Sequence, residues 1–291
     1  MRGTSPTATR STSRPSPGGS RTMRDPATTA RPAAPGARGT APGDALARHV
    51  RRLGDDALIL GQRLCETVTR APTIEEDLAL SNIALDLIGH ARVLLTRSGQ
   101  LDGSGRSEDD LAFRRTEREF ENVLLVELER GDFAVTIARQ LVFSHYAVLH
   151  YTALADAADP ELAAFGTRAA RESAYHRHHA DRWTERLGRG TAESHRRMQA
   201  AVDRVWPYTA ELFEEDELSR TLVATGAVPS VAALHDDWAA AVTAVLDRAG
   251  LTVPALGPQP RGGRDGLHTE DFAPLLAELQ SVHRQYPGGS W

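Results

Sequence analysis

The most apolar stretch of the chain is FAVTIARQLVFSHYAVLHYTALA, residues 133–155. It contains neither Asp nor Glu. Before it, Gly131 is expected to end the preceding helix and Asp132 to cap the start of the new one. After it, Asp159 is expected to cap a further helix that has Pro160 in its first turn. Proline is harmless at the first helical position, because the N–H that it lacks would have no helical partner there. The sequence therefore predicts a long apolar helix at 133–155 and a second helix directly after it.

Further helices are predicted on both sides of this stretch. Thr73 with Glu76 forms a capping box that opens a helix after Pro72, and Trp206-Pro207 should bend or break a later helix. No strand pattern and no repeat is visible, so the expected class is all-α. The other predicted helices cover residues 44–70, 108–129, 160–187, 191–225, 229–250 and about 269–286, with a loop at 253–267.

The helix that follows Thr73 carries two apolar stripes, each at helical spacing. Two stripes imply that this helix is buried on more than one side. The first stripe consists of Ile74, Leu78, Leu85, Ile88 and Leu95, and the second of Leu80, Ile83, Leu87 and Leu94.

The composition restricts the class of protein. The 291 residues are 41% hydrophobic and 25% charged, which is typical of a soluble folded protein, and the net charge of -5 does not suggest nucleic-acid binding. Cys65 is the single cysteine, so it can form neither an internal disulfide nor a cysteine zinc cluster. We expect Cys65 to be an inert core thiol in a reducing, cytoplasmic compartment. No apolar run is long enough to predict a membrane span.

Residues 1–43 differ in composition from the rest of the chain. All 34 basic residues of the protein are arginines, and seven of them lie in this Pro- and Ser-rich segment, against a single acid, Asp25. The segment also lacks the apolar region of a secretory signal. We expect either a disordered tail at 1–43 or a start codon assigned too early, followed by one helical domain at 44–291.

Four polar residues lie at helical spacing on two of the predicted helices. Asp86 precedes His90 by four residues, and Glu172 precedes His176 by four residues. A di-iron site in a four-helix bundle takes one Glu from each of two helices and a Glu-x-x-His pair from each of the other two. The i to i+3 spacing points both ligands at the same metal from one helical face. The two histidines therefore raise the question of a metal site.

The sequence lacks most of the carboxylates that such a site needs. The residues three positions before the two histidines are Leu87 and Ser173, and the stretch 133–155 offers no acid. A conventional di-iron centre is therefore missing at least three carboxylates, and we expect no metal in this chain. We expect each histidine to pair with the acid four residues before it, as helices often allow. The interior polar residues of the apolar stretch are Gln140, Ser144, His145 and His150.

Two other histidine patterns favour structural roles. In the run at 176–179, His176 and His179 share a helical face while His178 points elsewhere, which favours a solvated cluster over a ligand set. Asp265 and His268 have Asp-x-x-His spacing but lie in a glycine-rich loop, where we expect a loop-to-helix cap. Phosphate-binding glycine loops and a nucleophile elbow are absent from the sequence.

Several longer strings resemble the PaaC family, which comprises the C-subunit of the phenylacetyl-CoA epoxidase, also described as phenylacetate-CoA oxygenase. The resemblance extends from about residue 47 to residue 291. The strings are LGDDALILGQRL at 53–64, NIALDLIG at 82–89, NVLLVE at 122–127, GDFA at 131–134, TIARQ at 136–140, ESHRRMQ at 193–199, ELF at 211–213, GLHTE at 266–270, LAELQ at 276–280, and YPG at 286–288 with the terminal Trp291.

This resemblance implies a ferritin-like four-helix bundle with additional C-terminal helices. It also implies a place in aerobic phenylacetate catabolism, within a monooxygenase complex that epoxidises the aromatic ring of phenylacetyl-CoA. In that complex the di-iron site belongs to the related catalytic A-subunit, and the C-subunit is its structural partner. Flavin, iron–sulfur and NADPH act at a reductase subunit. Leu87 and Ser173 stand where the catalytic relative has the glutamates of its Glu-x-x-His pairs, and His90 and His176 stand at its histidines.

Three hypotheses follow for the chain. The favoured one is a non-catalytic, metal-free scaffold that packs against the catalytic A-subunit of the epoxidase. The rival is a di-iron oxygenase with an irregular ligand set of Asp86, His90, Glu172 and His176, and the third is iron storage, which needs a carboxylate cluster that the sequence does not provide. The sequence does not identify the interface residues, any contact with CoA or the stoichiometry of the complex.

Overall fold

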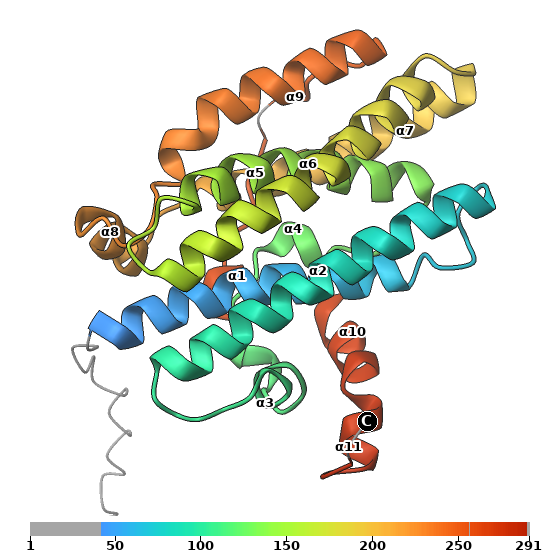
Figure 1. Ribbon diagram of the computed structural model, residues 1–291. Coiled ribbons are helices and arrows are strands. Elements are labelled where there is room, and N and C mark those ends of the chain that lie inside the picture. Colours follow the sequence, from blue (N-terminus) through green and yellow to red (C-terminus); the bar gives the residue numbers. More distant parts are fainter. Residues whose placement is uncertain (1–41, 256, 290–291) are drawn as a thin grey trace, which may run out of the picture. The chain divides into compact units, whose positions relative to one another are not determined.

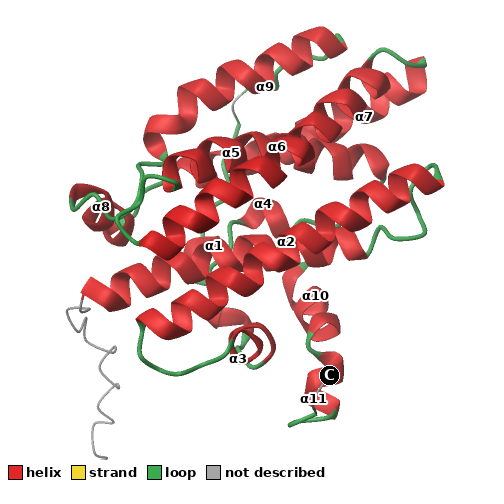
Figure 2. Ribbon diagram, viewed as in Figure 1, coloured by secondary structure: helices red, strands yellow, loops and turns green. Residues whose placement is uncertain are grey.

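The computed structural model describes residues 42–255 and 257–289. The tail predicted at 1–43 lies outside the described residues apart from its last two positions. In the described part, regular secondary structure consists of helices alone (Figure 2), which confirms the all-α class. The four longest helices are α1 (Pro42–Cys65), α2 (Ile74–Leu101), α5 (Phe133–Leu154) and α6 (Pro160–Gly188).

The four long helices pack as two hairpins. Helix α1 lies along α2, α5 lies along α6, and the hairpins meet where α2 approaches α6 (Figure 1). Two further helices, α7 (Ala192–Val205) and α9 (His235–Ala249), pack against the α5–α6 hairpin. This arrangement confirms the predicted ferritin-like bundle with additional C-terminal helices.

Shorter helices connect and close the bundle. They are α3 (Glu108–Phe113), α4 (Leu124–Glu127), α8 (Glu217–Ala224), α10 (Phe272–Leu279) and α11 (Ser281–Gln285). Single 3-10 turns occur at Glu117–Glu119, Trp206–Tyr208, Ala210–Phe213, Ala232–Leu234 and Gly263–Asp265.

Helix α5 is buried along most of its length, because its sequence offers no polar face. Its one charged residue, Arg139, is fully buried and donates from Nη1 to the Leu128 carbonyl at 2.6 Å. Gly166 of α6 allows the two helices to approach closely. A Cβ at this position would lie 2.7 Å from the backbone nitrogen of Ala155 and 2.8 Å from the carbonyl oxygen of Tyr151.

The predicted helix starts are largely confirmed. Thr73 accepts a hydrogen bond from the Glu76 amide, and Asp132 accepts one from the Val135 amide at the start of α5. Asp159 caps α6 with Pro160 in the first turn. The break predicted at Trp206-Pro207 is also present, because α7 ends at Val205 and a 3-10 turn follows.

The single helix predicted at 108–129 is wrong. The chain leaves helical geometry after Phe113 and regains it only at α4, apart from the single 3-10 turn. In between, the amide of Glu121 donates to Asp55 Oδ2 at 3.0 Å and the amide of Val123 donates to Asp56 Oδ1 at 2.8 Å. Two buried carboxylates of α1 therefore accept hydrogen bonds from backbone amides that would donate to carbonyls of the same helix if the helix were continuous.

Two helix ends and one cysteine also differ from prediction. Helix α1 ends at Cys65 rather than near residue 70, and the thiol is exposed, so the prediction of a core thiol is wrong. Thr269 does not cap the last helix. Its amide donates to Glu127 Oε1 at 2.6 Å, and α10 begins only after Asp271. A long-range carboxylate again overrides a local helix signal.

The two apolar stripes of α2 have different environments. The stripe that contains Leu80, Ile83, Leu87 and Leu94 is buried. In the other stripe Ile74, Leu78 and Leu85 are 85%, 62% and 65% exposed, and only Leu95 is fully buried. The prediction that α2 is buried on more than one side is therefore wrong. We call Ile74, Leu78, Leu85 and Ile88 the outer stripe.

Helix α2 is also, among the described residues, the one helix long and apolar enough to cross a membrane by length and composition. In its most apolar window 44% of the residues are buried inside the fold, since its inner face packs on α1. We therefore interpret α2 as a core helix with a second, uncovered apolar face.

Candidate functional site

The four polar residues singled out in the sequence meet between α2 and α6. Asp86 and His90 lie one turn apart on α2, and Glu172 and His176 lie one turn apart on α6. Both pairs face the line along which the two helices approach each other, so all four side chains meet across it. We call these four residues the crossed quartet.

Each histidine pairs with the acid of the opposite helix. His90 Nε2 lies 2.6 Å from Glu172 Oε2, and His176 Nε2 lies 3.0 Å from Asp86 Oδ2. The centroids of the two imidazole rings are 6.5 Å apart. The predicted pairing within each helix is therefore wrong. Each buried histidine does pair with a carboxylate, but with the one on the opposite helix.

The quartet has a buried side and a solvent side. His90 and His176 are almost fully buried, whereas the side chains of Glu172 and Asp86 are 32% and 39% exposed. Burial lowers the pKa of both histidines and outweighs the opposing effect of their carboxylate partners. Each imidazole is therefore neutral at pH 7 and donates its Nε2 hydrogen to a carboxylate. The rings of Tyr151 and Phe165 meet the His90 ring edge to face.

The residues around the quartet do not fit a pair of iron ions. Leu87 and Ser173, where the missing glutamates would stand, are both buried. Helix α5 supplies no carboxylate, and its His145 is already paired with Asp181 Oδ1 at 2.7 Å. Across residues 42–255 and 257–289, no group of three or more His, Cys, Asp or Glu side chains is arranged to hold a metal ion. Two iron ions need more negative charge than this lining supplies.

The other predicted histidine assignments need correction. His178 is exposed, but the side chain of His179 is largely buried and its Nε2 lies 2.7 Å from Glu76 Oε2. The run at 176–179 is therefore not a solvated cluster. His268 does not cap a helix. Its ring lies between Glu127 Oε2 at 2.7 Å and the Phe120 carbonyl at 3.0 Å.

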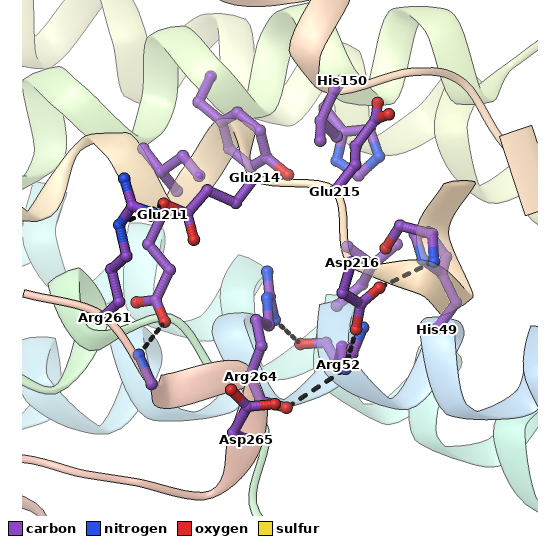
Figure 3. Close-up of a pocket in the computed structure, with 16 residues that line it drawn as sticks. His49, Arg52, His150, Glu211, Glu214, Glu215, Asp216, Arg261, Arg264 and Asp265 are labelled. Atoms are coloured by element: carbon purple, nitrogen blue, oxygen red, sulfur yellow. Dashed lines mark hydrogen bonds and ion pairs between the residues drawn. The ribbon is translucent and has the colours of Figure 1, made fainter. Parts of the chain in front are cut away.

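The sequence did not predict a cavity that lies beside the N-terminal half of α1. It has a volume of about 360 Å³, and Figure 3 shows His49 and Arg52 of α1, His150 of α5 and the acidic segment that precedes α8 around it. The only sequence signal for it was a histidine on each of two helices with no acid four residues before it. That pattern is too common to identify a site on its own.

The fold and the quartet together define the class: a ferritin-like helical protein with one buried histidine on each of two facing helices, and without the further carboxylates that a di-iron site needs. A family model described as "Phenylacetic acid catabolic protein" matches residues 34–291. The chain is also 45% identical over 246 residues to the C-subunit of the 1,2-phenylacetyl-CoA epoxidase of Escherichia coli (strain K12), and the match covers 84% of this chain and 99% of that protein. The chain belongs to the phenylacetic acid catabolic protein family, and the resemblance seen in the sequence is confirmed.

Proposed function

We propose that this chain is the non-catalytic structural subunit of a phenylacetyl-CoA 1,2-epoxidase, paired with the di-iron catalytic A-subunit in aerobic phenylacetate catabolism. The similarity to the C-subunit of an epoxidase, over nearly the whole length of that protein, supports the place in the complex. The observation that carries the non-catalytic role is the crossed quartet. Both of its histidines are paired with carboxylates, and within the described residues no group of three or more His, Cys, Asp or Glu side chains could hold a metal ion.

The outer stripe of α2 supports the pairing with another subunit. Contiguous exposed apolar surface on a folded protein commonly marks a protein interface. The stripe runs along one helix, and a helix face of this kind packs readily against a helix of a second bundle. A related helical bundle would offer such a helix to the outer stripe of α2.

Under this proposal the chain itself holds no cofactor. The di-iron centre lies in the catalytic partner, and flavin, iron–sulfur and NADPH act at the reductase, with the whole complex in the cytoplasm. The role of this chain is to hold the catalytic partner in a folded, assembled state.

The pairing is tested by gel filtration of this chain mixed with the catalytic partner. We expect co-elution for the parent chain and two separate peaks for Leu85→Arg, because the substitution places a charge in the apolar interface. Val253→Arg, at an exposed apolar residue outside α2, is the matched control and keeps the complex. Separate peaks for the parent chain would contradict the proposal.

The rival function, a di-iron oxygenase with an irregular ligand set, has a separate test. This chain, mixed with the reductase but without the catalytic partner, is expected to leave phenylacetyl-CoA unchanged. Formation of the epoxide in that mixture would favour the rival.

A further inference from the structure

The cavity beside the N-terminal half of α1 is separate from the crossed quartet, since no residue of the quartet lines it. Its walls come from α1, α5, the 3-10 turn at Ala210–Phe213, the first turn of α8 and the turn at Gly263–Asp265 (Figure 3). A volume of about 360 Å³ suits a small molecule, and Leu53, Leu212 and Val231 provide apolar surface within it.

Two buried histidines line this cavity without partners for their ring nitrogens. His150 is fully buried, and neither of its ring nitrogens makes a hydrogen bond with a described residue. His49 is more than nine-tenths buried, and its Nε2 also has no partner among the described residues. A buried polar atom left unpaired costs about 1–3 kcal/mol. These nitrogens therefore favour a hydrogen-bonding ligand in the cavity.

The two rings are neutral at physiological pH. Burial, with a smaller effect of the charge of Arg264, lowers the pKa of His150 to about 4. Burial, with smaller effects of His150 and Arg264, lowers the pKa of His49 to about 3. A neutral imidazole carries one nitrogen lone pair that accepts a hydrogen bond. Each ring can thus accept from an N–H donor of a ligand.

The charged residues around the cavity disfavour an anion. Each of its three arginines is already held by a carboxylate: Arg52 by Asp216, Arg261 by Glu214 and Arg264 by Asp56, all at 2.7 Å. The lining also carries five acids against these three arginines, a net negative charge. A bound anion would find no unpaired guanidinium in the lining and would be repelled.

Two of the lining acids retain free acceptor oxygens. The Asp265 side chain makes no hydrogen bond or ion pair with a described residue, and Glu215 uses only Oε1, which accepts from Ser230 Oγ and the Ala232 amide. A metal ion is a poor match, because within the described ranges no three ligand side chains converge. A cation that brings its own N–H donors matches these acceptors.

We propose that this cavity binds a small organic cation with a primary ammonium group and a short hydrocarbon chain. The ammonium hydrogens bond to the imidazole of His150 and to the free oxygen of Glu215, which lies beside it (Figure 3). The negative charge of Asp265, on the opposite wall, attracts the cation. The hydrocarbon chain packs on Leu53, Leu212 and Val231. Such a ligand links α1 and α5 to the segment around residues 212–215, so it stabilises their association.

The probe is n-butylammonium chloride, titrated into the full chain by calorimetry at constant ionic strength. Butan-1-ol and butyrate are the neutral and anionic controls of the same length. We expect saturable binding of butylammonium alone. Absence of butylammonium binding, or equal binding of butan-1-ol or butyrate, would overturn the proposal.

Two variants locate the site. Asp265→Asn removes a charge from an exposed residue and is expected to weaken butylammonium binding by about fivefold, while Asp237→Asn on the exposed face of α9 leaves it unchanged. His150→Phe removes both ring nitrogens and is expected to abolish binding. If Asp265→Asn binds butylammonium as tightly as Asp237→Asn does, the cation lies elsewhere and the proposal fails.

Discussion

The carboxylates of the crossed quartet accept hydrogen bonds from the imidazoles of the opposite helix. His90 and His176 are buried, and each reaches across to the other helix for its acceptor. A buried imidazole N–H left without an acceptor carries a desolvation penalty of about 1–3 kcal/mol. The pairs therefore stabilise the contact between α2 and α6 and occupy the side chains that could otherwise bind metal.

A double-mutant cycle tests the crossed pairing. His90→Leu combined with Glu172→Ala is expected to show a coupling of about 0.5–3 kcal/mol in the free energy of unfolding, because the two side chains are in direct contact. His90→Leu combined with Asp86→Ala should show a smaller coupling, within about 0.5 kcal/mol. Denaturant unfolding measures both. A larger coupling for the pair within α2 would mean that the residues pair along the helix and not across it.

The residues of the quartet could be identified from the sequence, but their pairing could not. Spacing of four places Asp86 and His90 on one face of a helix, and the same holds for Glu172 and His176. Which acid each histidine selects depends on how closely α2 approaches α6, and no local pattern encodes that distance. The cavity was missed for a similar reason, because His49 and His150 come from helices that meet only in the folded chain.

At the scale of elements, the stretch between α3 and α4 shows how buried charges override helix propensity. Asp55 and Asp56 of α1 are fully or almost fully buried, and each is paired with an arginine, Arg115 or Arg264. The same carboxylates accept backbone amides of the stretch 121–123. Helix starts with local caps were predicted correctly, whereas segments held by distant carboxylates were not.

Asp55→Asn tests this control of the stretch. The change leaves the Arg115 guanidinium buried without its counter-charge, which is expected to lower the free energy of unfolding by about 3–5 kcal/mol. The Glu121 amide should also exchange its hydrogen faster, since it donates to the same carboxylate. Denaturant unfolding and hydrogen exchange measure the two effects. Asp236→Asn, at an exposed position, is the control, and an equal loss in both variants would argue against a structural role for Asp55.

At the scale of the whole molecule, buried neutral histidines make stability depend on pH. Histidines of the unfolded chain titrate near 6.5, whereas burial lowers the pKa of His150 to about 4. Between these values the unfolded chain binds more protons than the folded chain, so the free energy of unfolding falls as the pH falls. The stabilisation is fully present above about pH 6.5 and is lost progressively down to about pH 4.

His150→Phe isolates this contribution. His150 alone accounts for a loss of roughly 3 kcal/mol across that window, so the variant should show a flatter decline in stability on acidification than the parent. Urea unfolding at a series of pH values measures the difference. Parallel curves for the two proteins would show that the pKa of His150 is the same in the folded and the unfolded chain, which would contradict the lowered pKa.

The central claim is that this bundle keeps the fold of a di-iron protein without the charge to hold the metal. The most direct measurement is the iron content of the separately purified chain after dialysis against buffer. The account predicts well below one iron per chain, because the quartet is paired internally and Leu87 and Ser173 supply no carboxylate. Close to two irons per chain, retained through dialysis, would contradict it.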